Sequence, residues 1–348
     1  MGKIFDFINK PLGFVLENLA DLFGGSFAWA VLIFTVLINL VLVPLTIKSQ
    51  KSTVQQTRIK PKLDALKKRY GDDKQKYNEA MQKLYQDEGV SMSGGCLPML
   101  LRLLLMMCIY TLILSPLTYM VGAKSNDINT VNTAISSSLA ELKKSDEDEY
   151  NKFISKYGWQ EGRSELSLVN IIRADDYNNY EKALTELLGK KKYGKIEKAL
   201  DAIVKKDKEK EIDFKFVSSK INLTETPKFS LDFTKAKPIW IMPLLAFVAQ
   251  ILSSLLSMAI QKKNNPEAPS MMGMMLTMPL ISLFIGFGLP GGVSFYWACS
   301  SIIGGAIQVA VQYAYGPHKM LSSTRAKELS KQCDFEAGQI EKLSSNKD

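Results

Sequence analysis

Five runs of apolar residues constrain this chain more than any other feature, because a helix of about 20 residues crosses a hydrocarbon core about 30 Å thick. The runs are Ala28–Ile47, Leu97–Met120, Ile239–Ile260, Met271–Leu289 and Val293–Tyr313. The overall composition, 46% hydrophobic and 23% charged, hides them, since nearly all charge lies in the stretches between the runs. Buried core helices are the alternative, but they are usually shorter. We therefore predict an all-α polytopic membrane protein with five transmembrane helices.

The residues before the first run predict an amphipathic helix that lies in the membrane interface. Apolar side chains recur at helical spacing at Ile8, Leu12, Val15, Leu19 and Phe23. Acidic residues lie on another face of the same helix, so the segment lacks the uninterrupted apolar core of a cleavable signal peptide. An interfacial helix is the favoured interpretation. An ordinary packed helix is the alternative.

The distribution of lysine and arginine predicts the orientation of the chain. Eleven of these residues lie between positions 48 and 95, after the first run, and six follow the fifth run. The loop after the third run adds Lys262 and Lys263, whereas the residues before the first run contain only Lys3 and Lys10. Basic residues in short loops mark the cytoplasmic side. The N-terminus is therefore expected outside and the C-terminus inside.

The polar segment between the first two runs predicts a cytoplasmic helical hairpin. Ile59, Leu63, Leu66 and Tyr70 define one apolar face, and Tyr77, Met81, Leu84 and Tyr85 define a second after the turn at Gly71-Asp72-Asp73. The first arm carries a basic surface made of Arg58, Lys60, Lys62, Lys67, Lys68 and Arg69. Such a surface suits anionic lipid headgroups or ribosomal RNA. A solvated charged face is the alternative.

Residues 121–237 predict a mainly helical extracytoplasmic insert. Asn178–Leu188 and Lys195–Val204 have helical patterns, and residues 214–227 alternate as a strand or a sheet edge would. The four cysteines avoid this segment, and His318 is the single histidine. This argues against a disulfide framework, a metal site and a catalytic triad. We expect no enzyme activity and no cofactor.

Three parts of the sequence resemble the YidC membrane protein insertase family. In the hairpin and second run (50–102), the marks are Gln50-Lys51-Ser52, Lys60-Pro61, Lys68-Arg69-Tyr70, Leu84-Tyr85 and Gly95-Cys96-Leu97-Pro98. The first run is similar from Thr35 to Lys48, including Pro44, and the last run (289–312) through its Pro-Gly link, Tyr296-Trp297 and Gln308. The insert lies outside the resemblance, and the similarity resumes at Ile221-Asn222-Leu223.

The resemblance implies a membrane protein insertase and chaperone in a bacterial cytoplasmic membrane, without a cleavable signal. Hydrophobic segments of nascent proteins would pass through a hydrophilic groove into the lipid bilayer, with the ribosome and the Sec translocon as candidate partners and no small-molecule cofactor. The expected parts are 1–26 interfacial helix, 27–48 first span, 49–95 hairpin, 96–120 second span, 121–237 insert, 238–260 third span, 261–270 loop, 271–289 fourth span, 290–292 turn, 293–314 fifth span and 315–348 basic cytoplasmic tail.

Arg102 is the clear ionisable residue inside a span. A charge at mid-membrane costs about 2.5–3.5 kcal/mol on insertion scales, so it usually faces a bundle interior or a wet cavity. The family resembled here carries an arginine in the first span, and that position corresponds to Asn39 in this chain. We hypothesise that Arg102 supplies the positive charge of the groove and that Asn39 hydrogen-bonds it or a water. Snorkelling of Arg102 to the headgroups is the alternative.

Three further residues are groove candidates by resemblance: Gln250, Trp297 and Gln308. Trp297 has an alternative role as an interfacial anchor, and the serines at helical spacing in the spans suit interhelical contacts. Arg58, Lys60, Lys67, Lys68 and Arg69 are expected to recruit cytoplasmic partners. A transporter or channel, or a receptor that uses the insert, remains an alternative class. No internal repeat and no Gly-x-x-x-x-Gly-Lys-Ser/Thr loop occurs in the sequence.

Overall fold

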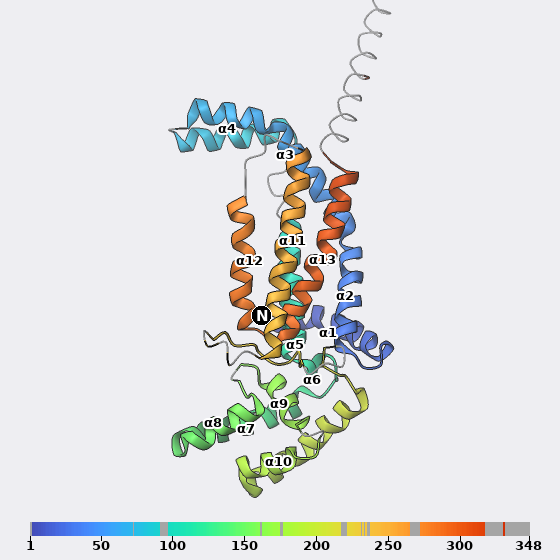
Figure 1. The fold of residues 1–348 in the computed structure, drawn as a ribbon, viewed down its shortest axis with the longest axis vertical. Coiled ribbons are helices and arrows are strands. Elements are labelled where there is room, and N and C mark those ends of the chain that lie inside the picture. Colours follow the sequence, from blue (N-terminus) through green and yellow to red (C-terminus); the bar gives the residue numbers. More distant parts are fainter. Residues whose placement is uncertain are drawn as a thin grey trace, which may run out of the picture. The chain divides into compact units, whose positions relative to one another are not determined.

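A computed structural model describes residues 2–71, 73–90, 97–160, 162–174, 177–216, 221–230, 232, 234, 237–264, 272–316 and 330. The chain divides into two compact units (Figure 1). The insert unit comprises Met1–Ile38, Leu104–Ile251 and Leu276–Ile302. The hairpin unit comprises Asn39–Leu103, Leu252–Met275 and Ile303–Asp348. Every regular element within the described residues is a helix, which confirms the all-α prediction.

Apolar helices make up the part of the chain that we expected in the membrane. They are α2 (Phe27–Val41), α3 (Val43–Tyr70), α5 (Leu97–Leu114), α11 (Ile241–Asn264), α12 (Met272–Phe287) and α13 (Gly291–Ala314). Within the described residues, Pro238–Ile260 and Gly291–Ala314 are each long and apolar enough to cross a membrane, and the bent pair α2–α3 gives a third candidate. Leu103–Leu114 and Thr277–Phe287 are shorter apolar helices. Five spans therefore remain a prediction.

Large apolar side chains project outward from α11 and α12. Leu252 is 62% exposed and Phe284 is 65% exposed. Contiguous apolar surface of this kind is rare on soluble monomers, because water would be in contact with it. A lipid environment removes that cost, so these surfaces fit the apolar phase of a bilayer.

The first predicted span differs from a straight helix. α2 and α3 meet at a bend of 51°. Pro44 lies in the first turn of α3 and cannot donate a backbone hydrogen bond, which explains why the helix restarts there. From Val43 the same helix continues to Tyr70, so the first arm of the hairpin is a continuation of the span.

The helical hairpin in the hairpin unit is formed by α3 and α4 (Lys74–Asp87). Ile59 is 1% exposed, and the other residues of the two predicted apolar faces are partly buried. Asp73 caps α4 by accepting a hydrogen bond from the Lys76 amide at 3.1 Å. Lys62 and Glu88 form an ion pair between the arms. Gly71 itself keeps a right-handed conformation, so α3 does not end at a left-handed glycine. The turn between the two arms depends instead on the Asp73 cap of α4.

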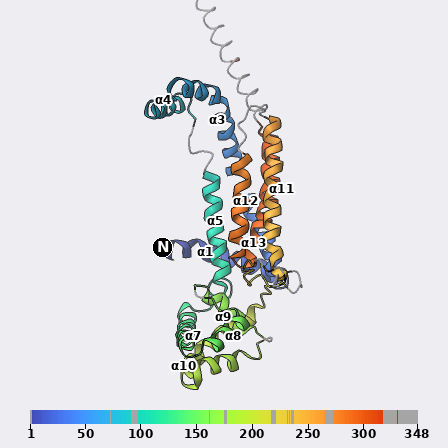
Figure 2. The ribbon, with the colours of Figure 1, turned by 60° about the vertical axis from the view of Figure 1, so that its left-hand side comes forward.

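The insert is a helical layer built from four helices. They are α7 (Ser125–Ser145), α8 (Glu147–Tyr157), α9 (Ser164–Ile172) and α10 (Tyr180–Lys210). Figure 2 shows them together with the short helix α6 (Pro116–Tyr119), which joins α5 to the insert. α10 contains a break at Gly189, whose φ of 73° separates the two predicted helical stretches. The mainly helical character of the insert is thus confirmed.

An extended return segment, described at residues 212–216 and 221–229, ties the insert to the ends of the apolar helices in the same unit. The Phe27 amide donates to the Asp213 carbonyl at 2.9 Å, and the amides of Gly291 and Gly292 donate to the carbonyls of Glu225 and Leu223 at 2.8 and 2.7 Å. A Cβ added to Gly291 would lie 2.4 Å from Ile239 Cδ1, which explains a glycine there. Isolated bridges replace the predicted strand.

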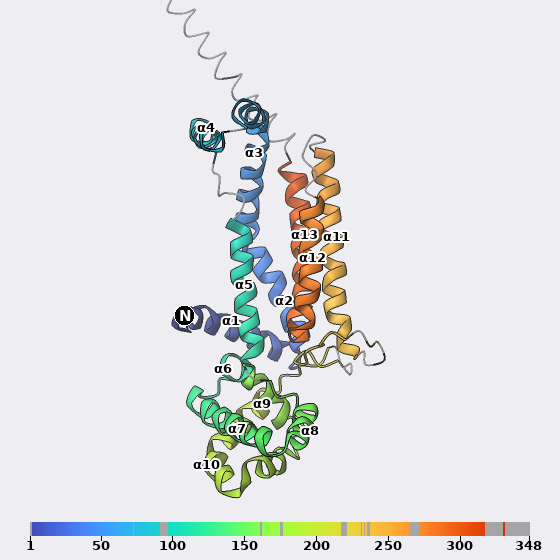
Figure 3. The same ribbon diagram turned by 90° about the vertical axis from the view of Figure 1, so that its left-hand side faces the viewer.

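The N-terminal helix α1 (Gly2–Leu22) confirms the helical prediction for the leader. Asn9, Leu16 and Ala20 are fully buried and share one face of α1, whereas Phe7 and Phe14 are 82% and 64% exposed. The exposed aromatic side chains leave an apolar face available, as an interfacial helix requires. Figure 3 shows α1 next to α6, and the Tyr119 hydroxyl donates to Asp6 Oδ1 at 2.5 Å.

Candidate functional site

Buried amides join three helices of the hairpin unit. Gln308 Nε2 on α13 donates to Gln50 Oε1 on α3 at 3.4 Å, and Gln312 Nε2 donates to Ser257 Oγ on α11 at 3.1 Å. Gln50 is 8% exposed and Gln312 is 2% exposed. We call Gln50, Ser257, Gln308 and Gln312 the polar cluster. Two of its three helices, α11 and α13, are largely apolar, whereas α3 is polar around Gln50.

Two buried polar atoms of the hairpin unit have no hydrogen-bond partner within the described part of the chain: Ser52 Oγ and Gln312 Oε1. An unsatisfied buried polar atom costs about 1–3 kcal/mol. Such atoms in native proteins call for a specific explanation, such as ordered water or a functional partner. The polar cluster therefore has hydrogen-bonding capacity that the described protein groups do not use.

Close helix packing brings α11 and α13 together beside the polar cluster. A Cβ added to Gly305 would lie 2.2 Å from Ser253 Oγ, so only glycine fits between the two backbones at this point. Small residues and hydroxyls at helix contacts are typical of membrane bundles, where close packing replaces the hydrophobic effect. Ser257 lies on α11 and Gln312 lies on α13. The contact between these two helices therefore also fixes the position of Ser257 relative to Gln312.

Asn39 and Gln308, two of the predicted groove residues, lie in the hairpin unit. Asn39 is 7% exposed. Counting along the chain, Thr46 and Gln50 follow Asn39 at i+7 and i+11, and all three are buried. The side chain of Arg102 lies outside the described residues, although its backbone belongs to α5. Its proposed pairing with Asn39 thus stays a prediction.

The other two predicted groove residues, Gln250 and Trp297, lie in the insert unit. Gln250 Oε1 accepts a hydrogen bond from Ser282 Oγ at 2.8 Å, which links α11 to α12. Trp297 packs against a small apolar cluster formed by Ala246, Ala249 and Ala298. Both side chains therefore have structural contacts of their own. Their part in a groove remains a prediction.

The basic residues of the hairpin follow the predicted pattern of exposure. Arg58, Lys67, Lys68 and Arg69 are exposed and Lys60 is partly buried. The Arg69 guanidinium lies 5.3 Å from the centre of the Tyr70 ring. A surface of exposed cations can attract an anionic partner over about a Debye length, roughly 8 Å at physiological salt.

Sequence reasoning missed Gln50 as a buried residue, because Gln50 was assigned to the start of the polar hairpin. The spacing of Gln50 from Asn39 and Thr46 could have indicated its burial. If helical periodicity is continued across the bend, the three side chains fall on one helix face. Gln312 and Ser257 lie at helical spacing with other polar residues of their spans. Their hydrogen bond was not expected.

Comparison with known proteins matches residues 18–172 and 213–318 to a family described as the 60Kd inner membrane protein. The match runs through residues 121–172, so the expectation that the whole insert lies outside the family resemblance was wrong. It resumes at Asp213, where the return segment forms its first bridge to the apolar helices. Residues between the two matched parts include the whole of α10.

Similar proteins carry the name Membrane protein insertase YidC. One from Alkalihalophilus pseudofirmus is 40% identical over 111 residues, which are 30% of this chain and 44% of that protein. One from Stutzerimonas stutzeri is 35% identical over 108 residues, 31% of this chain and 19% of that protein. One from Neisseria meningitidis is 40% identical over 102 residues, which are 29% of this chain and 18% of that protein. The chain thus matches less than half the length of each of these relatives. Because the family match covers more than half of the chain, the chain belongs to the 60Kd inner membrane protein family.

Proposed function

We propose that this protein is a membrane protein insertase and chaperone, which moves hydrophobic segments of nascent proteins into the bilayer through a hydrophilic groove. The observation that carries the proposal is the polar cluster, with its unused hydrogen-bonding capacity, where α3 meets the apolar helices α11 and α13. Membership of the family and the printed names of the relatives support it.

In the proposed topology, five helices cross the cytoplasmic membrane of a bacterium. The N-terminus lies outside, the hairpin and the basic tail lie in the cytoplasm, and the insert is extracytoplasmic. Eleven Lys and Arg residues between positions 48 and 95 support this orientation. In this orientation the polar cluster would lie at the cytoplasmic ends of the spans, because Gln50 directly follows the first span (27–48) and Gln312 lies near the end of the fifth (293–314).

The polar cluster would lower the cost of moving a short polar tail part-way through the membrane. Amides of Gln50, Gln308 and Gln312 can both donate and accept hydrogen bonds, so they suit the unpaired peptide groups of a passing chain. Arg102 would attract acidic residues of the tail, where a reduced dielectric strengthens the attraction, and Asn39 would hydrogen-bond this arginine or a water.

The hydrophobic segment of the substrate would then leave sideways into lipid. Burial of its own apolar surface drives this step. No covalent bond changes, and the scheme requires no cofactor. The exposed cations of the hairpin would hold ribosomal RNA or anionic headgroups near the entry, and the Sec translocon is a further proposed partner.

Reconstitution into liposomes with a small single-span substrate tests the proposal. The wild-type protein is expected to increase the fraction of substrate that reaches a protease-protected orientation. Arg102→Ala should lower this fraction, and Arg102→Lys should restore most of it, because the lysine keeps the charge. Full activity of Arg102→Ala would remove the arginine from the mechanism. No insertion by the wild-type protein would contradict the proposed function itself.

A further inference from the structure

A cleft of about 1200 Å³ lies in the insert, apart from the polar cluster. It is lined by α8, α9, the end of α10 and the return segment, all within the insert unit. Pockets for small molecules are usually about 300–1000 Å³ and mostly apolar. This cleft is larger and mixes charged, amide and aromatic side chains, so its shape suits an elongated polar ligand rather than a compact one.

The charge of the cleft is positive. Seven of the described lining residues are Lys or Arg, and three are Asp or Glu. The two arginines are committed to the fold, since Arg173 pairs with the fully buried Asp207 and Arg163 bonds to Thr226 Oγ1 at 2.8 Å. The excess charge therefore comes from lysines on the walls. All five of them are exposed: Lys156, Lys208, Lys215, Lys228 and Lys237.

The walls also match the hydrogen-bonding pattern of a peptide. Amide side chains from Asn151, Gln160, Asn170 and Asn222 line the cleft; the oxygens of the last three accept hydrogen bonds within the insert, so these three offer mainly their NH₂ groups as donors. Tyr157, Tyr177 and Phe214 add aromatic surface. An extended chain presents backbone donors and acceptors on both edges. The cleft thus offers partners for a peptide backbone as well as for acidic side chains.

The cleft adjoins the ends of the apolar helices of the same unit. Arg163 Nη2 donates to the Gly288 carbonyl at 2.5 Å, in the turn between α12 and α13. Two other lining residues, Asp213 and Glu225, accept hydrogen bonds from the Phe27 and Gly291 amides. A chain that emerges beside these helix ends would therefore meet the cleft at once.

We propose that this cleft binds an extended acidic peptide segment, namely the translocated end of an inserting substrate. The proposal rests on the proposed function and adds a second site to it. The acidic tail that Arg102 attracts on one side would be received by the lysines of the cleft on the other. Retention of the tail would oppose its return through the groove.

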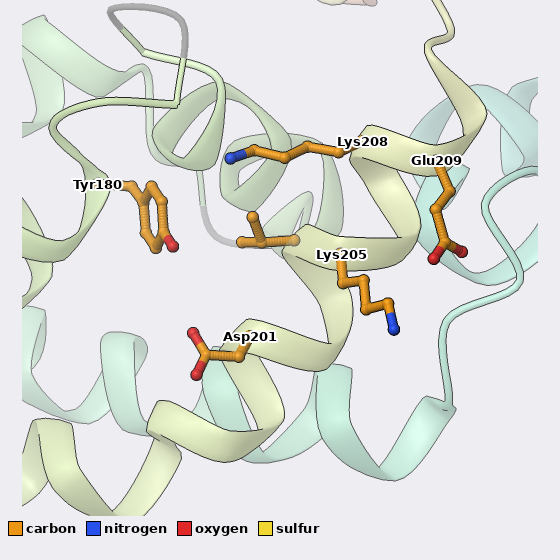
Figure 4. A pocket seen from close by; sticks show the side chains of 6 residues that line it. Tyr180, Asp201, Lys205, Lys208 and Glu209 are labelled. Atoms are coloured by element: carbon orange, nitrogen blue, oxygen red, sulfur yellow. The ribbon is translucent and has the colours of Figure 1, made fainter.

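A second hollow in the insert, of about 450 Å³, does not carry such a proposal. Figure 4 shows Lys208 extending toward Tyr180, whereas Lys205 and Glu209 point away from them. The two acidic and two basic residues that line it balance in charge. Lys208 lines both hollows, so this one extends the positive wall of the larger cleft.

Binding of a fluorescent acidic peptide to the full chain in zwitterionic nanodiscs tests the proposal. The probe is a short extended peptide rich in Asp and Glu, compared with a matched peptide in which Lys replaces the acids. We expect preferential binding of the acidic peptide, weakening with salt. The double charge reversal Lys215→Glu/Lys228→Glu should weaken it about tenfold. Lys190→Glu/Lys191→Glu, on exposed residues that do not line the cleft, is the control and should leave affinity unchanged.

Three outcomes would overturn the proposal: equal affinity for both peptides, equal loss in the control variant, or a loss of binding to anionic vesicles with peptide affinity unchanged. The last outcome would assign the lysines to a lipid surface. Insertion of a substrate with an uncharged tail should be unaffected by Lys215→Glu/Lys228→Glu. If peptide binding fails while the wild-type protein inserts this substrate, only the cleft proposal falls. If wild-type insertion fails, the proposed function falls independently of the cleft.

Discussion

The network around Asp207 in the insert unit and the polar cluster of the hairpin unit both bury polar side chains, but they satisfy them differently. In the insert, Arg173 donates to Asp207 at 2.6 and 2.8 Å, and the Tyr177 hydroxyl donates to the same carboxylate at 2.8 Å. In the hairpin unit, Gln312 is nearly as buried, yet its Oε1 has no partner within the described residues. The Asp207 network is complete, whereas the polar cluster leaves one of its buried oxygens without a partner; among the described residues of the insert unit, Asn9 and Asn132 also carry buried atoms without a partner.

This difference separates a polar group that holds a fold from one that is available for function. A satisfied buried network rigidifies its surroundings, because each member loses a bond if another moves. A buried amide with spare capacity among apolar helices stabilises nothing by itself. We infer that the insert network is structural and that the polar cluster serves a passing substrate.

The largest expected effect is on the insert network. Asp207→Ala leaves the Arg173 guanidinium buried without its carboxylate, so we expect the insert to lose about 3–5 kcal/mol of stability. Hydrogen exchange of the α9 and α10 amides measures this. Asp201→Ala, at an exposed position on the same helix, is the control and should change stability little. A similar small change in both variants would mean that the pair is not structural.

The contact between α11 and α13 comes next. Gly305→Ala places a Cβ 2.2 Å from Ser253 Oγ, so we expect a loss of about 1–3 kcal/mol from forced separation. Thermal unfolding in detergent measures the loss. Adding Ser253→Gly removes the opposing side chain and should restore most of the stability. Absence of rescue would show that the two helices do not meet at this point.

A substitution in the polar cluster should change the stability of the protein and its insertion activity in opposite directions. Gln312→Leu removes an unsatisfied buried oxygen, so stability should stay level or rise by about 1 kcal/mol. Insertion in liposomes should fall about tenfold, which corresponds to about 1.4 kcal/mol of activation free energy. Tyr313→Leu, at the neighbouring and 78% exposed position, is the matched control. Lower stability with unchanged insertion would assign Gln312 to the fold.

The smallest effect is expected at the hairpin surface. Lys67→Glu/Lys68→Glu should weaken association with anionic vesicles or with ribosomes, by about 1 kcal/mol for each lysine lost near a charged membrane. Thermal stability should stay within about 0.5 kcal/mol, since both side chains are exposed. Vesicle flotation and ribosome pelleting separate the two partners. Unchanged association in both assays would support a merely solvated charged face.

Local patterns predicted much of this fold. The hairpin faces, the Asp73 cap and the break of α10 at Gly189 depend on residues close in the sequence, so their spacing and turn chemistry carried the information. The bend before Pro44 was also readable in principle, since proline removes a backbone donor. It was missed because the apolar run continues through it.

Long-range contacts account for the rest. The return segment joins Asp213 to Phe27 and Glu225 to Gly291 through backbone atoms, which leave no trace in side-chain patterns. Gln50 and Gln308 are 258 positions apart, so no local period relates them. The resemblance to a family supplied candidate groove residues, whereas the amide partners of those residues depended on three-dimensional packing.

Access of water to Asn39 tests the central claim most directly. Asn39 is 7% exposed and its neighbour Leu40 is 56% exposed, on a different face at nearly the same depth. In a variant without the four native cysteines, Asn39→Cys and Leu40→Cys are treated with a water-soluble thiol reagent in liposomes. The account predicts that Asn39→Cys reacts, that a bound substrate protects it, and that Leu40→Cys stays unreactive in lipid. An unreactive Asn39→Cys would contradict a hydrated polar path between the helices.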